Sequence, residues 1–174
     1  MLKTFAIVML GVWVTLSASA AELTGKVIRI ADGDTLTVLI DCAKLDVPIR
    51  LAGIDAPEKG MAFGNVSKQS LADLALGKQV VVVWGKKDKY GRVVGKVLVD
   101  GLDANLEQVK RGLAWHYKEY ESEQTAEDRE AYATAETAAK TAGAGLWKDK
   151  EPTPPWAWRK AKRADGEEAP VDVK

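Results

Sequence analysis

The sequence predicts an α+β fold that is mainly β, with five strands closed into a small barrel and about three helices. Two observations lead to this class. Short β-branched or alternating apolar runs recur between residues 23 and 99, and one helical pattern interrupts them after the third run. Five strands with a helix after the third are typical of the OB-type Greek-key barrel.

The first two strands form a predicted hairpin. The apolar runs 27–30 and 36–40 flank Asp32-Gly33-Asp34, and an Asp-Gly pair between β-branched runs is typical of a tight connection. The third strand is expected over 47–54, where the alternation of apolar residues directs Arg50 away from the apolar side.

The remaining elements follow the same patterns. A helix is expected over 67–76, and strands over 79–84 and 93–99. Two helices should then cover 103–111 and 125–142, the second of them rich in alanine and glutamate.

Residues 1–20 have the pattern of a secretory signal peptide. An uncharged run over 5–16 precedes Ala18-Ser19-Ala20, which fits a cleavage site before Ala21. An uncleaved membrane anchor is the alternative, but the run is shorter than the roughly 20 residues that span a bilayer. We therefore expect one OB-type domain over 21–147 in a secreted or periplasmic protein, without stable membrane insertion.

The tail over 148–174 has a different composition. It is rich in proline, then in tryptophan and basic residues, and it becomes polar beyond about Ala164, where we expect disorder. Cys42 is the only cysteine, which excludes an intramolecular disulfide. Because no histidine or second cysteine stands near it in the sequence, we expect neither a catalytic thiol nor a zinc site there.

Charge is balanced overall, with 25 basic and 25 acidic residues, so the whole molecule has no excess charge to attract a polyanion. The distribution is uneven. The segment 78–96 holds six basic residues and one acidic residue, whereas 119–136 holds seven acidic residues and one basic residue. Either the first segment forms a basic face beside a binding site, or both are ordinary solvated surfaces.

Three short motifs carry the chemistry: Asp32-Gly33-Asp34-Thr35, the run from Ile49 to Glu58, and Asp88-Lys89-Tyr90-Gly91-Arg92. Together they supply carboxylates for a hard cation and arginines for a phosphate. A cation and guanidinium groups both stabilise the charge that develops on phosphoryl oxygens, so this combination is suited to phosphodiester cleavage.

From Leu23 to Trp147 the chain resembles the staphylococcal nuclease-like (thermonuclease) family, on the strength of these three motifs in order. Gly112-Leu113-Ala114-Trp115 and Gly145-Leu146-Trp147 are similar to the family as well. The resemblance implies an OB-type barrel and calcium-dependent hydrolysis of DNA and RNA.

The resemblance also implies a calcium site. Asp34 and Asp55 would be the ligating carboxylates, and the main-chain carbonyl of Ala56 would complete the protein's share, with waters and a substrate oxygen filling the other positions. Asp32 either assists these ligands from behind or simply begins the turn.

Three further residues would act on the phosphodiester. Glu58 would be the general base that orients the attacking water, the alternative being an exposed loop residue paired with Lys59. Arg50 and Arg92 resemble the two phosphate-binding arginines of the family. On its own residues, Arg50 could equally be a surface barrel residue in a salt bridge.

Aromatic residues would complete the substrate pocket. Lys89 and Tyr90 match positions that line it, although a Lys-Tyr pair in a turn is also ordinary loop sequence. Tyr117 is the candidate for a further substrate-binding tyrosine after the Gly-Leu-Ala stretch. For His116, the only histidine, we expect a packing or surface role rather than general-acid catalysis.

The residues and the resemblance together predict an exported nuclease with little sequence specificity that acts as a monomer. The resemblance implies that cleavage depends on calcium and leaves 3′-phosphate ends. Single-stranded DNA and RNA should be preferred, because a small barrel face binds unstacked bases better than duplex edges. Two alternatives are a noncatalytic nucleic-acid-binding domain of the same fold, and a surface module whose 156–163 segment binds an anionic envelope component.

Overall fold

The computed structural model describes residues 21–166. The predicted signal peptide over 1–20 and the end of the tail, where disorder is expected, lie outside the described residues.

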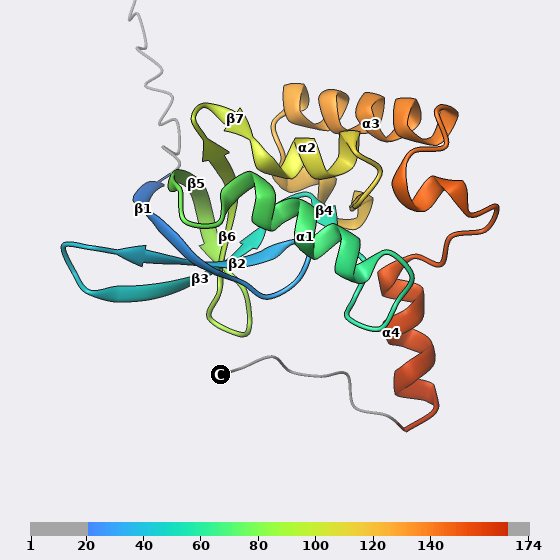
Figure 1. Cartoon of the computed structure of the whole chain (residues 1–174), viewed down its shortest axis with the longest axis horizontal. Coiled ribbons are helices and arrows are strands. Elements are labelled where there is room, and N and C mark those ends of the chain that lie inside the picture. Colours follow the sequence, from blue (N-terminus) through green and yellow to red (C-terminus); the bar gives the residue numbers. More distant parts are fainter. Residues whose placement is uncertain (1–20, 167–174) are drawn as a thin grey trace, which may run out of the picture.

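The architecture is a closed barrel with helices packed around it (Figure 1). Antiparallel pairing gives the strand order β3-β2-β1-β5-β6, and a parallel pairing of β3 with β6 closes the barrel, which confirms the predicted fold class. The strands of the barrel are β1 (Ala21–Ile30), β2 (Thr35–Ile40), β3 (Leu45–Leu51), β5 (Gln79–Lys87) and β6 (Val93–Val99). Three two-residue strands complete the sheets: β4 (Ile54–Asp55), β7 (Leu102–Asp103) and β8 (Trp115–His116).

Alternation along the strands builds the core. In β2 and β3 the apolar positions Leu36, Val38, Ile49 and Leu51 are each at most 1% exposed, because every second side chain points into the barrel. The predicted hairpin is confirmed, since β1 and β2 pair antiparallel around the Asp32–Asp34 connection. The third strand is shorter than predicted: β3 ends at Leu51 because Gly53, at φ 73°, turns the chain before β4 begins.

The three predicted helices are present, with small shifts of their ends. They are α1 (Gly64–Ala75), α2 (Ala104–Lys110) and α3 (Ala126–Thr141). Two short 3₁₀ segments are also present: Lys118–Glu123 lies between α2 and α3, and Gly145–Lys148 follows α3. Side-chain caps from Asp103 and Thr125 begin α2 and α3.

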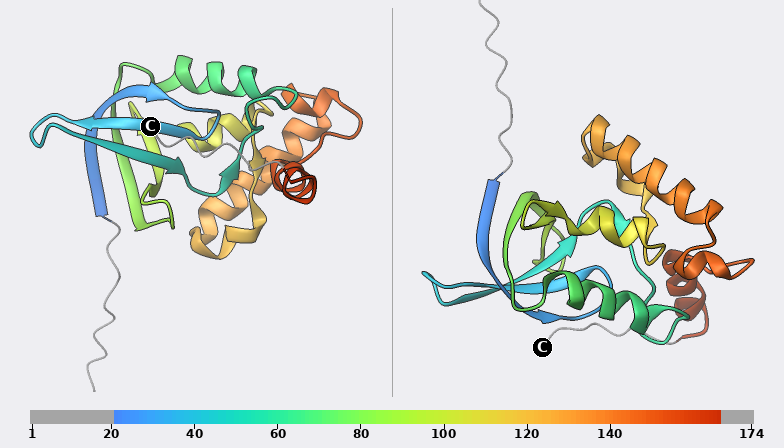
Figure 2. Two further views of the ribbon diagram at one scale, coloured as in Figure 1. Left: turned by 90° about the horizontal axis from the view of Figure 1, so that it is seen from below. Right: turned by 45° about the horizontal axis from the view of Figure 1, so that its top comes forward.

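A fourth helix, α4 (Pro155–Ala164), occupies the tail and was not predicted. Pro155 stands at its first turn, where the ring's fixed φ is compatible with a helix and the missing N–H leaves no bond unmade. Figures 1 and 2 show α4 at one end of the molecule, beside the loop that leads into α1. No helix among residues 21–166 is long and apolar enough to cross a membrane.

Candidate active site

The first motif forms a rigid loop between β1 and β2. Asp32 accepts a hydrogen bond from the Asp34 N–H at 3.0 Å, and Gln108 of α2 donates to the Gly33 carbonyl at 2.8 Å. A Cβ on Gly33 would stand 1.9 Å from the hydroxyl oxygen of Ser67, so only glycine lets the loop approach α1 this closely. The loop thereby fixes Asp34, which is 5% exposed.

The second motif brings Asp55 to the same place. Asp55 lies in β4, pairs with Trp115 of β8 and is fully buried. The N–H of the next residue, Ala56, donates to Asp34 at 2.6 Å, which joins the two motifs directly. Asp34, Asp55 and Ala56 therefore form one cluster from two separate segments, as the resemblance implied.

Arg50 bridges the two carboxylates. Its register in β3, opposite Thr35 of β2, sets its guanidinium 2.5 Å from Asp34 and 2.8 Å from Asp55. The side chain is 15% exposed. Arg50 is thus in salt bridges, as the alternative expected, but they lie inside the carboxylate cluster rather than on an open barrel surface.

The cluster concentrates negative charge away from water. Burial raises the pKa of Asp32 to about 7, and the neighbouring charge of Asp34 adds to this effect. Burial also raises the pKa of Asp55 despite the opposing effect of Arg50. For Arg50 burial acts to lower the pKa, but the charges of Asp34 and Asp55 outweigh it and raise it. Such a site favours cations.

Glu58 lies at the rim of this cluster, in the loop after β4, and its side chain is 27% exposed. Its partner is not Lys59, as the alternative reading supposed, but Arg159 of α4, whose Nη1 donates to Glu58 at 2.5 Å. The same guanidinium donates to Asp55 at 2.7 and 3.2 Å.

The sequence patterns do not place Arg159 in the site. The tail is aromatic and basic, and Pro154-Pro155 before Trp156 is a helix-start pattern from which α4 could have been predicted.

Tyr117 lies beside the cluster. Its ring stacks on Trp156 of α4, with centroids 5.3 Å apart and planes 6° apart, and its hydroxyl donates to Glu119 at 2.8 Å. Burial raises the pKa of Tyr117 to about 12, helped by that hydrogen bond and by the charge of Asp55. Tyr117 therefore stays protonated and presents a ring next to the carboxylates.

The third motif forms a cluster of its own in the β5–β6 loop. Arg92 donates to Asp88 at 2.7 Å and lies over the ring of Tyr90, 5.4 Å from its centroid, while Lys89 lies 5.0 Å from the same centroid. Arg92 lowers the pKa of Asp88 against the effect of its partial burial.

Among residues 21–166 no hydrogen bond or ion pair joins this loop to the carboxylates. The parallel register of β3 and β6 nevertheless sets Val94 opposite Arg50, two residues along the chain from Arg92.

Two other expectations are resolved by the structure. His116 is 2% exposed, contacts Gln124 at 2.8 Å and packs edge-on against Tyr132, so the packing role is confirmed. In the basic segment 78–96, two of the six basic residues pair with the acidic segment: Lys86 with Glu123, and Lys96 with Asp128 at 2.6 Å.

Two carboxylates are the protein's side-chain contribution to any cation here. Within the part of the chain that the structure describes, no three histidine, cysteine, aspartate or glutamate side chains are arranged to hold a metal. Asp34 and Asp55 both contact one guanidinium, however, so a cation can be placed between them, and calcium accepts water and substrate oxygens for its remaining positions.

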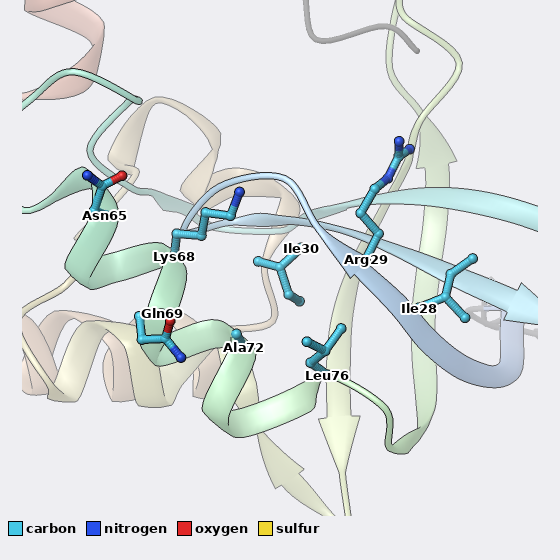
Figure 3. Close-up of a pocket in the computed structure, with 8 residues that line it drawn as sticks. All are labelled: Ile28, Arg29, Ile30, Asn65, Lys68, Gln69, Ala72 and Leu76. Atoms are coloured by element: carbon cyan, nitrogen blue, oxygen red, sulfur yellow. The ribbon is translucent and has the colours of Figure 1, made fainter.

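A groove of about 570 Å³ lies elsewhere, between β1 and α1 (Figure 3). Figure 3 shows Arg29, Lys68 and the apolar side chains of Ile28 and Leu76 along it. None of the site residues predicted from the sequence lines this groove.

The barrel and the carboxylate–arginine cluster define a nuclease of the staphylococcal type. The chain belongs to this family: the family model described as "Staphylococcal nuclease homologue" matches residues 48–149.

Individual relatives agree. An uncharacterized endonuclease of Haemophilus influenzae is 40% identical over 153 residues, which cover 87% of this chain and 82% of that protein. The micrococcal nuclease of Shigella flexneri is 37% identical over 152 residues, covering 82% and 84%. The chain is therefore a hydrolase of the nuclease class.

Proposed function

We propose that this chain is an exported, calcium-dependent nuclease that hydrolyses phosphodiester bonds of DNA and RNA and leaves 3′-phosphate ends. One observation carries the proposal: two buried carboxylates, Asp34 and Asp55, share a single guanidinium directly beside the carboxylate loop of Glu58. Cation ligands, a phosphate-binding arginine and a candidate base are thus adjacent.

The cation would be held by Asp34, Asp55 and the carbonyl of Ala56, and when bound it supplies positive charge at a phosphate oxygen. The chain's own residues supply the rest. Arg50 presents a planar pair of donors from the barrel wall, where its strand holds it in place for the phosphate. The partial exposure of Glu58 leaves its carboxylate accessible to a water, whose proton it would accept as the water attacks phosphorus. The bond from phosphorus to the 5′ oxygen would break in the same displacement, and the leaving oxygen would take a proton from solvent.

Arg92 would act from the β5–β6 loop. Its bond to Asp88 orients the guanidinium, and the exposed ring of Tyr90 beneath it offers a surface for a sugar or base. Tyr117 offers a second ring, next to Trp156 of α4.

These contacts favour single-stranded substrate, because rings at the surface can stack on splayed bases, and nothing here would read base edges in a groove. We further propose that the protein acts as a monomer, and that it is secreted or periplasmic because residues 1–20 have the pattern of a signal peptide.

The experiment that tests the proposal is cleavage of end-labelled single-stranded DNA by the chain from Ala21 to Lys174, with calcium or with excess chelator. Calcium-dependent cleavage with 3′-phosphate ends is expected. An Asp34→Asn variant should behave like the chelated protein. Binding without cleavage under both conditions would instead support the noncatalytic nucleic-acid-binding alternative.

A further inference from the structure

Helix α4 packs against the candidate active site. Trp156 stacks on Tyr117 at 5.3 Å and meets Trp115 edge-on at 6.2 Å, and Pro155 at the start of the helix is buried. Figure 2 shows the helix at the end of the molecule where the loop leading into α1 lies. These aromatic contacts help to hold α4 against the domain.

Arg159, one turn further along α4, reaches into the carboxylate cluster. One of its nitrogens, Nη1, contacts both Glu58 and Asp55, and the other, Nη2, contacts Asp55. Its side chain is 26% exposed, and the charges of Asp55 and Glu58 outweigh burial and raise its pKa, so it is a permanent cation.

The position of this guanidinium determines what it can touch. A phosphodiester attacked by a water at Glu58, with an oxygen on the Asp55 side, must lie beside a group that contacts both carboxylates. A guanidinium can hold two phosphoryl oxygens at once, so its chemistry suits that neighbour.

Cation binding would release Arg159 for this role. Asp55 is paired with both Arg50 and Arg159, and a divalent cation there adds positive charge beside two guanidinium groups. Arg50 is fixed in the barrel wall and 15% exposed, whereas Arg159 extends from a peripheral helix. Arg159 is therefore the group that gives up its bonds to Asp55.

We propose that Arg159 is a third phosphate-binding arginine of this site, supplied by α4 and paired with Asp55 and Glu58 until a cation and a phosphodiester bind. This inference rests on the proposed nuclease function. It makes the tail part of the reaction centre rather than an appendage to the barrel.

The test measures binding of a phosphorothioate single-stranded oligonucleotide, which resists cleavage, to the chain from Ala21 to Lys174 in calcium. Arg159→Ala should weaken binding about 10-fold, because it removes hydrogen bonds between charged groups. The slope of log affinity against log salt should fall by about 0.7, the value for one lost phosphate contact on a single strand.

Three further measurements sharpen the test. Arg159→Lys should keep the salt slope but recover only part of the affinity, because a lysine cannot make the paired contact. Lys160→Ala removes the same charge from an exposed neighbour and should change binding less than Arg159→Ala. Terbium luminescence should show tighter cation binding in Arg159→Ala, since a competing cation has been removed from Asp55.

The outcomes separate the possibilities. If Arg159→Ala keeps its affinity and salt slope, the proposal is wrong. Faster cleavage with that unchanged affinity would identify α4 as an inhibitory strap instead. Tryptophan fluorescence reports whether Trp156 stays docked. If Arg159→Ala releases Trp156, the affinity of Arg159→Lys decides whether the guanidinium binds phosphate. A lysine variant with wild-type affinity would overturn the paired-contact argument. A wild-type protein that neither binds nor cleaves would refute the nuclease function itself.

Discussion

Replacing Glu58 by glutamine removes the carboxylate that would act as the base but keeps a side chain of nearly the same size. The side chain is 27% exposed and its ionic partner is Arg159, which keeps two contacts to Asp55 in the variant. A pair this exposed contributes less than about 1 kcal/mol to stability, so the fold should survive. Loss of a general base typically costs about 10²- to 10⁴-fold in rate, or roughly 3 to 5 kcal/mol of transition-state stabilisation.

The assay compares turnover at saturating single-stranded DNA in calcium with thermal unfolding of the same samples. Glu119→Gln is the matched control, because Glu119 is an exposed glutamate near the site whose contact is the Tyr117 hydroxyl. We expect turnover to fall in Glu58→Gln alone, with both melting temperatures close to wild type. Wild-type turnover in Glu58→Gln would refute the assignment of the base, and a parallel loss of stability would show that the rate reports folding instead.

Four other predictions follow from the same contacts. Arg92→Ala should lower turnover by about 10²-fold, the usual cost of one donor to a developing oxyanion, while the midpoint of urea unfolding stays unchanged. Excess chelator should abolish cleavage, and added calcium should both restore it and raise the melting temperature, because calcium binds the folded state. Gly33→Ala should destabilise the protein by about 1 to 3 kcal/mol in urea titrations, since its Cβ would overlap Ser67. For Glu136, burial acts to raise the pKa but Lys140 outweighs it, and the pKa is lowered. Its stabilising effect is present above the ordinary glutamate pKa and lost as pH falls through the lowered value, so the difference in melting temperature between wild type and Glu136→Gln should shrink in acid.

Local sequence patterns predicted the barrel because each strand and turn has its own pattern of apolar and turn-forming residues. The Asp-Gly pair between β1 and β2 sets a tight connection, and the alternation along β3 separates Ile49 and Leu51 in the core from Arg50 in the site. These features depend on neighbours within a few residues, which a sequence displays directly.

Long-range contacts were less accessible. The bond from the Ala56 N–H to Asp34 joins residues 22 apart, and the bonds of Arg159 span more than 100. No periodicity records such distances. The proximity of Asp34 and Ala56 was expected only from the family resemblance, and neither the bond between them nor the contacts of Arg159 were predicted. The ion pair between Lys96 and Asp128, which joins the basic segment to the acidic one, could not be predicted for the same reason.

The tail shows what composition does not reveal: disorder was expected only beyond about Ala164, but no helix was predicted before it. Prolines and exposed charges from Lys148 onward are typical of a segment that cannot bury enough apolar surface to fold by itself. Helix α4 packs against the domain, however: Trp156 contacts Trp115 and Tyr117, which both belong to the domain. The helix therefore depends on aromatic residues that the sequence separates from it by some forty positions.

The carboxylate cluster is where the requirements of folding and of catalysis diverge. Burial raises the pKa of both Asp32 and Asp55, which means that the fold holds these charges at a cost. An apolar barrel would have avoided the cost by burying aliphatic side chains at the same positions. Arg50, in the barrel, offsets part of the cost of burying these carboxylates, and Arg159, on α4, offsets a further part. The domain and its tail therefore both contribute to the charge balance of the cluster. Under the proposal made above, a ligand that adds positive charge disturbs that balance and displaces Arg159, which is the more exposed of the two arginines.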